Sequence, residues 1–583
     1  VMAQNCGNVE AAARRFVGDK VADTSEAVAG AANIIAEWVS EDETARERVR
    51  NTFRRYGRMT SKVIKGKEEE AGNFSNYFKV DEPLQRCQSH RYLAMRRGEA
   101  EGFLRVGIEI DDDRMVAQLL QRFVRRNATP ACAAIVEEAV RDGYRRLMRP
   151  SIESQIAQEA KEKADDAAIR AFADNVHQLL LAPPLGARRT LGIDPGYRTG
   201  CKVVVLDANG NLLVHDVIYP TPPRNYTVDA ERRLLKYVSE YEVEAIAIGN
   251  GTASRETEKF VRAIRFPHKV EIFVVSENGA SVYSASKVAR EEFPDQDVTV
   301  RGAVSIARRL MDPLAELVKI DPKSIGVGQY QHDVDQSKLK RSLDAAVETC
   351  VNQVGVNINT ASRQLLSYVS GIGDALAANI VAYRAENGDF RSRREIMRVP
   401  RLGAKAFEQA AGFLRVPGSD NILDNTGVHP ERYDVVARMA ADAGCATEEL
   451  VRNREVLGAI KLDRYVGGNL GLPTLTDIIA ELEKPGRDPR EKASEFAFDE
   501  NVREISDLSE GMVLPGIVNN ITDFGAFVDI GVHESGLIHV SQMASRRVGH
   551  PSEVVRLHQQ VKVRVISVDL QRKRIGLSLR DVD

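Results

Sequence analysis

The sequence predicts a multidomain fold that is mostly α-helical, with one α/β domain, a pair of repeated helical hairpins and a C-terminal β-barrel. Its 583 residues exceed what one hydrophobic core usually serves, so about three to five domains are expected. Helical periodicity fills the first third of the chain and gives way at residue 188 to short, β-branched runs. From residue 509 onward, short strands alternate with glycine turns.

The composition is that of ordinary globular material. Hydrophobic residues make up 43% of the chain and charged residues 28%, and no apolar run is long enough to span a bilayer. Six cysteines stand singly, which favours free thiols in a reducing compartment over disulfides or structural zinc. We therefore expect a cytoplasmic protein that does not enter a membrane. Because Val1 falls within helical sequence, we also expect the natural chain to begin further upstream.

Residues 1–187 are expected to form an N-terminal helical domain. Apolar residues recur at intervals of three and four in MVAQLLQRFVRR and AIRAFADNVHQLLLAPP, where a Pro-Pro-Leu-Gly sequence ends the run. The basic segment RERVRNTFRRYGRMTSKVIKGK fits either a solvated helix face or a surface that contacts phosphates. Composition does not separate these two interpretations.

Residues 188–320 predict an α/β domain. The runs RRTLGID, CKVVVLDANGNLLVHDVIYP, EVEAIAIGNG and KVEIFVVSEN indicate five strands, with Asn209-Gly210 at a hairpin between the second and third. Helices follow the fourth and fifth strands. Three hairpin-joined strands followed by strand–helix–strand–helix are the order of an RNase H-like fold rather than a doubly wound one. The stretch GIDPGYRTG resembles the YqgF domain, a relative of Holliday-junction resolvases.

Acidic residues near the strand ends of this domain are candidate metal ligands. Asp194 ends the first strand, where a cation would satisfy a carboxylate that is costly to leave unpaired, although Asp-Pro-Gly also fits a simple turn. Paired-metal cleavage needs several carboxylates. Asn250 occupies the tip of the fourth strand, where a nuclease would carry an acid, so only Glu277 and Asp312 remain as further vestigial candidates. We therefore expect no catalytic residue, no bound metal and no cofactor.

After a connecting segment at 321–360, residues 361–430 contain one motif twice. LLSYVSGIGDALAANIVAYR carries Gly371 and Gly373, and EIMRVPRLGAKAFEQAAGF carries Gly403. Glycine permits positive φ and a close approach of the backbone, and the N–H groups of the following helix can then bind a phosphate.

The repeated motif resembles the tandem helix-hairpin-helix domain of DNA-binding and repair proteins. Between Ser362 and Val416 nine Lys and Arg residues face five Asp and Glu, which suits sequence-independent contact with a nucleic-acid strand. The alternative is a pair of glycine-capped hairpins with no ligand. Residues 431–500 return to a helical pattern and a linker, where we expect no site.

Residues 508–583 predict a five-stranded OB-fold barrel. Two of its phenylalanines are three positions apart in ITDFGAFVDI, so a regular strand would place them on opposite faces unless a glycine bulge turned both outward. Exposed aromatic rings stack nucleobases. The segments GIVNNITDFGAFVDIG, GLIHVSQ and DLQRKRIGLSLR closely resemble the S1-type RNA-binding domain. On that family's RNA face fall Phe524, Phe527, His539, Asp569 and Arg574. The alternative is core phenylalanines in a protein-binding barrel.

The order of these parts resembles the Tex family of bacterial transcription accessory proteins. SHRYLAMRRGE, VGQYQHDV and VHPERYD are further family-like stretches. The resemblance implies a non-enzymatic protein that binds RNA, and DNA as well, with little sequence specificity and mainly through the S1 domain, and that has RNA polymerase or the ribosome as candidate partners. The alternative is a metal-dependent, resolvase-like nuclease that uses the YqgF domain.

Overall fold

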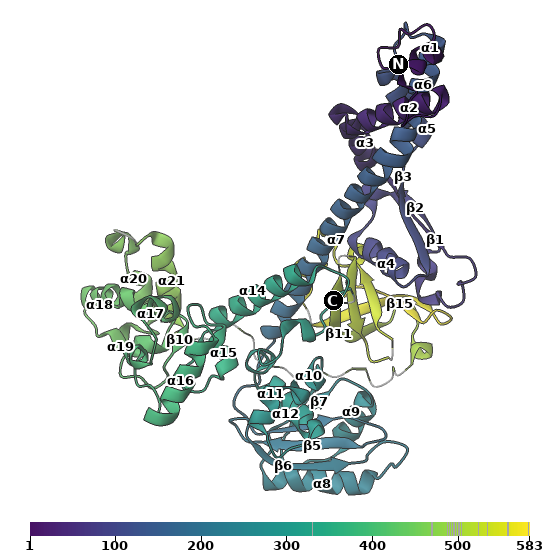
Figure 1. Ribbon diagram of the computed structural model, residues 1–583. Helices are drawn as coiled ribbons and strands as arrows, with labels where there is room; N and C mark the ends of the chain where they lie inside the picture. Colours follow the sequence, from purple (N-terminus) through teal and green to yellow (C-terminus); the bar gives the residue numbers. More distant parts are fainter. Residues whose placement is uncertain are drawn as a thin grey trace. The chain divides into compact units, whose positions relative to one another are not determined.

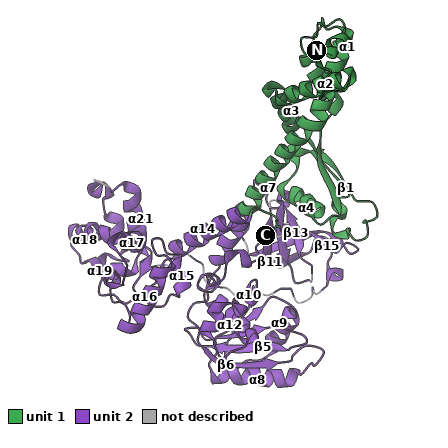
Figure 2. Ribbon diagram, in the orientation of Figure 1, with its two compact units in different colours: residues 1–170, 330–335 green, residues 171–329, 336–583 purple. Residues whose placement is uncertain are grey.

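The computed structural model divides into two compact units, residues 1–170 with 330–335 and residues 171–329 with 336–583 (Figure 2). In the part of the chain that the structure describes, no helix has the length and apolar character needed to cross a membrane. The structure describes all residues except 329, 468, 469, 487, 489, 491, 492, 494, 495, 497, 500, 501, 503, 523, 533, 557, 558, 581 and 583.

The first unit combines helices with a small sheet. The helices are α1 (Val9–Ala13), α2 (Thr24–Glu41), α3 (Glu43–Tyr56), α4 (Ser89–Ala100), α5 (Asp112–Phe123), α6 (Pro130–Asp142) and α7 (Arg149–Leu180), which continues beyond residue 170. The strands are β1 (Arg58–Val63), β2 (Lys79–Pro83) and β3 (Leu104–Glu109), in the antiparallel order β2-β1-β3.

This sheet corrects the expectation of an entirely helical N-terminal domain. In β1, Met59 and Ser61 are buried while their neighbours face outward, which is the two-residue alternation of a strand. Each strand is only five or six residues long and is flanked by strongly helical sequence. The helical periodicity of the surroundings therefore obscured the alternation.

The basic segment of residues 46–67 begins in α3, and its helical part pairs with another helix. Three of its arginines stand one helical turn apart, and their guanidinium groups reach three residues with the same spacing on α7. Arg46, Arg50 and Arg54 donate, in that order, to Ser151 at 3.0 Å, Gln155 at 3.2 Å and Glu159 at 2.8 Å. Arg46, Arg50 and Arg54 are therefore engaged within the unit, although the Arg54 side chain stays 45% exposed and the remaining basic residues of the segment are not part of this ladder.

The second unit begins with the predicted RNase H-like domain (Figure 1). Its sheet has the order β6-β5-β4-β7-β8, in which β4, β5 and β6 are antiparallel and β7 and β8 run parallel to β4. The strands are β4 (Thr190–Asp194), β5 (Cys201–Leu206), β6 (Leu212–Ile218), β7 (Ala245–Gly249) and β8 (Glu271–Val275). The expected fold is confirmed.

Helices cover both faces of this sheet. One face packs on α8 (Thr227–Glu240), a helix between the third and fourth strands that the sequence analysis did not predict. The other face packs on α12 (Val298–Met311), whose Ala307 approaches β4 so closely that a Cβ on Gly192 would stand 2.8 Å from it. The remaining helices are α9 (Ser254–Ala263), α10 (Ala280–Ala285), α11 (Lys287–Glu292) and α13 (Pro313–Leu317).

Helical hairpins follow the long helix α14 (Gln336–Val354). The first hairpin is α15 (Arg363–Ser367) and α16 (Asp374–Asn387); in the second, a 3-10 helix at Arg393–Arg398 precedes α17 (Ala404–Ala410). Short strands β9 (Val356–Asn357) and β10 (Leu414–Arg415) pair in parallel and bracket the two hairpins. A further helical cluster contains α18 (Tyr433–Asp442), α19 (Thr447–Leu450), α20 (Arg454–Ala459) and α21 (Leu472–Glu483).

The chain ends in a closed five-stranded barrel of order β11-β12-β13-β15-β14, as expected for an OB-fold. Its interior is filled by aliphatic side chains, among them Val518, Val528, Ile538 and Leu577. The strands are β11 (Val513–Thr522), β12 (Gly525–Asp529), β13 (Gly536–His539), β14 (Gln560–Asp569) and β15 (Arg574–Ser578).

Candidate nucleic-acid interface

The outer face of the barrel is set by the register of three neighbouring strands. Phe527 on β12 pairs with Leu537 on β13, which in turn pairs with Gly576 on β15. Directly paired residues share a face, and both Phe527 and Leu537 are half-buried while their sequence neighbours point into the core. A Cβ on Gly576 would overlap Ser567 Oγ, so only glycine fits at the end of this row. Phe527, Leu537 and Gly576 thus form a row across three strands, in which an aromatic ring stands next to a leucine and a position without a side chain.

Phe524 extends this face by a route that differs from the expected glycine bulge. It lies in the turn before β12, where strand alternation does not dictate its direction, and the register irregularity is instead on β11, between Val518 and Asn520. The rings of Phe524 and Phe527 meet edge to face, with centroids 6.0 Å apart and planes at 90°. Neither ring belongs to the buried barrel core, which disfavours the alternative of core phenylalanines.

The polar candidates lie on the same face. His539 stands two residues after Leu537, and Arg574 stands two residues before Gly576. Because side chains two positions apart in a strand point to the same side, both lie on the face that carries Phe527. Asp569 is paired directly with Arg574 across the β14–β15 hairpin. His539 Nδ1 accepts a hydrogen bond from Ser541 N–H at 3.2 Å, which fixes the imidazole ring. Among the described residues Arg574 is exposed and has no ion-pair partner, so its charge is available to an anion.

The two hairpin turns are built differently. Gly371 has φ +82°, and a Cβ there would stand 2.7 Å from Gln409 Cβ, so the first turn packs against the second hairpin. In the second turn the residue with positive φ is Arg401, at +66°. Gly373 and Gly403 have φ of −83°, so the expectation that they need glycine for positive φ is wrong.

Gly373 and Gly403 instead keep two helix starts open. A Cβ on either glycine would meet nothing within 4 Å, and each precedes a helix that lacks a side-chain cap. The N–H groups of α16 and α17 are therefore accessible to a phosphate. At the first start, the Asp374 carboxylate pairs with Arg363. An acid at a helix start opposes an anion, and the first turn of α17 carries no acid.

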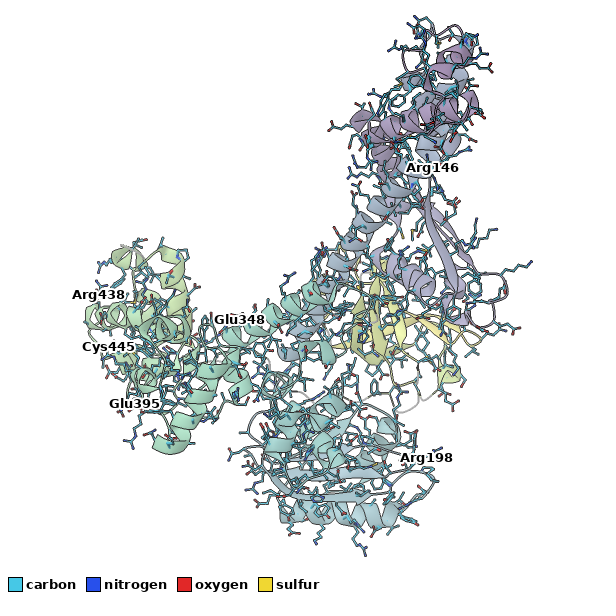
Figure 3. The ribbon with its side chains drawn as sticks, in the orientation of Figure 1. Arg146, Arg198, Glu348, Glu395, Arg438 and Cys445 are labelled. Atoms are coloured by element: carbon cyan, nitrogen blue, oxygen red, sulfur yellow. The ribbon has the colours of Figure 1, made fainter. Side chains whose placement is uncertain are left out.

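The strand tip of the RNase H-like domain retains two of the predicted acids. Asp194 is the last residue of β4. Arg198 is exposed in the loop that connects β4 to β5 (Figure 3). Burial, together with the negative charge of Glu277 and against the positive charge of Lys202, raises the pKa of Asp194 to about 6. The Glu277 carboxylate lies over Gly251, where a Cβ would overlap it.

Asn250 stabilises the loop that holds Glu277 rather than supplying a charge. Its Oδ1 accepts a hydrogen bond from Glu277 N–H at 3.1 Å. Its own N–H donates to the Val275 carbonyl at 2.9 Å. The side chain and the backbone N–H of Asn250 therefore both hold the segment after β7 against the end of β8 and the segment that follows it.

Asp312 does not join the other two acids, contrary to the expected set. Gly302 is the residue of α12 that faces Asp194, with a Cβ position 3.4 Å from Asp194 Oδ2. Asp312 follows ten residues later, roughly 15 Å further along the helix axis. It caps α13 through Ala315 N–H at 3.2 Å and pairs with Arg490 at 2.7 Å.

A buried arginine reaches the strand tip from the same helix. Arg309 donates to the carbonyls of Ser276 at 2.9 Å and Asn278 at 2.6 Å, which lie on either side of Glu277. Burial lowers the pKa of Arg309 to about 10, against the charges of Glu316 and Glu277. Arg309 could not be singled out from the sequence because it is one of several charged residues in an amphipathic helix. Among the described residues no three His, Cys, Asp or Glu side chains are arranged to hold a metal ion.

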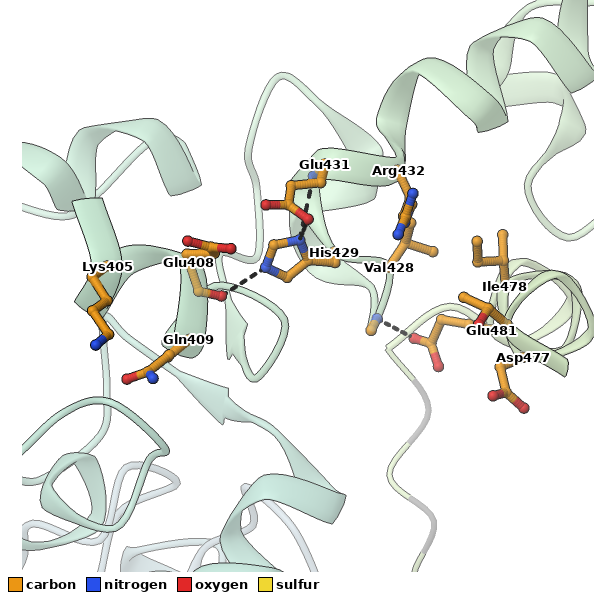
Figure 4. Close-up of a pocket in the computed structure, with 12 residues that line it drawn as sticks. Lys405, Glu408, Gln409, Val428, His429, Glu431, Arg432, Asp477, Ile478 and Glu481 are labelled. Carbon is orange, nitrogen blue, oxygen red and sulfur yellow. Dashed lines mark hydrogen bonds and ion pairs between the residues drawn. The ribbon is translucent and has the colours of Figure 1, made fainter. Parts of the chain in front are cut away.

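A hollow of about 660 Å³ lies between the second hairpin and α21 (Figure 4). His429 links the VHPERYD stretch, residues 428–434, to α17. Its Nε2 lies 2.8 Å from the Glu408 carbonyl, and its Nδ1 lies 3.6 Å from Glu431 Oε2 within the same stretch. Glu481 accepts a hydrogen bond from Gly427 N–H at 2.6 Å. The lining carries the acids Glu408, Glu431, Asp477 and Glu481 against the bases Lys405 and Arg432, and this excess of negative charge does not favour a phosphate.

Comparisons with known proteins agree with this architecture. The model of the Tex protein YqgF-like domain matches residues 188–311, and that of the Tex central region-like domain matches residues 6–172. "Transcriptional accessory protein Tex" of Neisseria gonorrhoeae is 48% identical over 590 residues, which cover 100% of this chain and 77% of that protein. The chain belongs to the Tex family.

Similar sequences are found in further organisms. "Protein YhgF" of Escherichia coli is 48% identical over 588 residues, which cover 98% of this chain and 75% of that protein. "S1 RNA-binding domain-containing protein 1" of Homo sapiens is 32% identical over 630 residues, which cover 94% of this chain and 63% of that protein.

Two nucleic-acid-binding domain types of this Tex family member are matched by general models. The S1 RNA binding domain matches residues 507–580 and the helix-hairpin-helix motif residues 351–415. A second helix-hairpin-helix model matches residues 421–490, where the sequence analysis expected only helices and a linker without a site.

Proposed function

We propose that this Tex family protein binds RNA, and DNA as well, with little sequence specificity and mainly through the outer face of its S1 barrel. The observation that carries the proposal is the convergence of Phe524, Phe527, His539 and Arg574 on one face. Aromatic faces stack any base, and an unpaired guanidinium attracts phosphate. Perpendicular rings stack bases that are turned apart, which suits an unpaired strand rather than a duplex.

The open helix starts of the hairpins supply a second, weaker contact. Backbone N–H groups at Gly373 and Gly403 would hold phosphate oxygens, which carry no sequence information. Separate weak sites on one chain raise the overall affinity because the second contact forms within an already bound complex.

We further propose that the protein is not a nuclease. Of the predicted acids, Asp194 and Glu277 approach each other at the strand tip and Asp312 does not; Asn250 is neutral, and Arg309 brings a positive charge to the same place. Two ions held in line need more carboxylates than this. The alternative of a resolvase-like nuclease has Asp194 as its strongest support and is tested below.

The proposal is tested by replacing both S1 aromatics. Phe524→Ala with Phe527→Ala should weaken equilibrium binding of labelled single-stranded RNA to the full chain at least tenfold, because each stacked base contributes about 1–3 kcal/mol. Phe16→Ala removes a ring that is 71% exposed but lies in the first unit, and serves as the matched control. Unchanged affinity of the double variant would refute the proposal.

A cytoplasmic location and protein partners such as RNA polymerase or the ribosome are further proposals that follow from the family. Co-purification from lysate after nuclease treatment separates contact through protein from contact through RNA. Retention of RNA polymerase or ribosomal proteins after treatment would support a direct partner, and their loss would reduce the interaction to shared RNA.

A further inference from the structure

A row of three cations crosses the sheet of the first unit. Lys62 on the central strand β1 is paired directly with Lys79 on β2 and with Arg105 on β3. Directly paired residues of antiparallel strands point to the same side, so all three side chains share one face. All three are exposed. We call Lys62, Lys79 and Arg105 the cation row.

The face that carries the cation row is the outer face of the sheet. The opposite face supplies core residues, since Met59, Ser61, Val80, Leu104 and Ile108 are buried. The charges of the row are therefore not needed to pack the sheet against its helices.

The cation row differs from the rest of this outer face in lacking acids. Arg58, four positions before Lys62, pairs with Asp81, and Glu109 is directly opposite it. Among the described residues, no member of the row has an acidic group within 4 Å or a hydrogen-bond partner, and this includes the glutamates at 68–70 in the loop that follows β1. The positive charge of Arg58, at the other end of β1, is thus balanced by Asp81 and Glu109, whereas the charges of the cation row are not balanced by a described acid within that distance.

Three like charges in directly opposed positions repel one another and destabilise the sheet. Such an arrangement is expected where stability is lost in exchange for binding an anion. Neighbouring strands are about 4.8 Å apart, so the row spans about 10 Å, and its long side chains can reach successive phosphates of one strand.

We propose that the cation row binds the phosphodiester backbone of a nucleic acid, at a site separate from the S1 barrel and the hairpins. The inference rests on the proposed nucleic-acid function and adds a third contact to it. Because lysine and arginine would meet phosphates here, the row contributes affinity and salt dependence without sequence preference.

The test compares two triple variants of the full chain. Lys62→Gln, Lys79→Gln and Arg105→Gln remove the row, and the control removes the same charge from the same unit. The control residues are exposed and without partners among the described residues: Arg14→Gln, Arg15→Gln and Lys20→Gln. Affinity for labelled single-stranded RNA is measured over a series of salt concentrations.

Loss of three phosphate contacts should reduce the slope of log affinity against log salt by about 2, because each contact on a single strand contributes about 0.7. The control should keep the wild-type slope, and the charge-retaining triple Lys62→Arg, Lys79→Arg, Arg105→Lys should keep most of it. A row variant with the same slope and affinity as the control would overturn the inference.

Other outcomes separate this inference from the proposed function. If wild-type protein binds RNA and the Phe524, Phe527 variant does not, while the row variant matches its control, only the cation row is refuted. Polyglutamate serves as a second probe. Loss of polyglutamate binding with unchanged RNA binding would assign the row to an acidic protein and overturn its role with nucleic acid.

Thermal unfolding checks the premise that the row is unpaired. Removing mutual repulsion should raise the Tm of the first unit at low ionic strength, and the increase should shrink at high salt. A lower Tm would mean that the row has an internal partner and would contradict the inference.

Discussion

At the residue scale, Asp194 has an electrostatic environment that should show in the pH dependence of stability. Its pKa is raised to about 6 chiefly by burial, so the folded protein keeps this proton to higher pH than the unfolded chain does. The stabilising contribution is therefore fully present below about pH 4, near the unperturbed value, and is lost as pH rises through about 6.

Asp194→Asn should consequently raise the stability of the RNase H-like domain at pH 7.5, by about 1–3 kcal/mol, and have little effect near pH 4. Calorimetry at both pH values measures the difference. Asp295→Asn, which removes an exposed acid of the same domain, is the control. Destabilisation by Asp194→Asn at pH 7.5 would mean that the carboxylate is held by a partner such as a cation.

Sequence reasoning found the site residues that belong to short ordered motifs and failed for those defined by packing. The five S1 candidates were found through the resemblance of short ordered motifs to the S1-type domain, and strand pairing brings Phe527, His539 and Arg574 to one face, whereas Phe524 reaches it from the turn before β12. Arg309 and Asp312 differ in this respect. Whether a helical side chain reaches a strand tip depends on how the helix crosses the sheet, and α12 directs Arg309 there and Asp312 away.

At the element scale, the glycines of the first hairpin turn should separate folding from binding. Gly371→Ala should destabilise the hairpins by about 1–3 kcal/mol, because alanine disfavours φ +82° and its Cβ would press on Gln409 and the Ala406 carbonyl. Gly373→Ala has open space and φ of −83°, so its effect on stability should stay below about 1 kcal/mol.

Nucleic-acid affinity should respond in the opposite way for Gly373. A methyl group there would stand where a phosphate must approach the N–H groups of α16, so Gly373→Ala should weaken DNA binding with almost unchanged Tm. Thermal unfolding and binding of a DNA duplex by the same preparations measure both effects. If Gly373→Ala binds DNA normally, the first hairpin is a packing element only.

Elements with strong local signals were predictable, whereas those that depend on tertiary context were not. The order of β4 to β8 followed from β-branched runs separated by turns, and the structure confirms it. The sheet of β1, β2 and β3 was missed because its short strands pair across long intervening segments. In the second turn the residue with positive φ is Arg401 rather than the expected Gly403.

At the scale of the whole molecule, the proposed function rests on several nucleic-acid contacts along the chain rather than on one active site. We propose that the S1 face, the hairpin turns and the cation row each offer stacking or phosphate contacts that are individually weak. Their combined affinity should fall steeply with ionic strength, since released counterions accompany every phosphate that is neutralised. The hairpins and the S1 barrel were evident from the sequence because each has its own motif, whereas the sheet that carries the cation row was not.

Binding without cleavage is tested by incubating end-labelled single-stranded RNA and a branched DNA with the full chain in Mn²⁺. Native and denaturing gels are run from the same tubes, beside Asp194→Asn. We predict a shifted band on the native gel and full-length nucleic acid on the denaturing gel, for both proteins. Shortened products that disappear in Asp194→Asn would contradict it, and would show that Asp194 and Glu277 suffice for a metal-dependent nuclease despite Asn250.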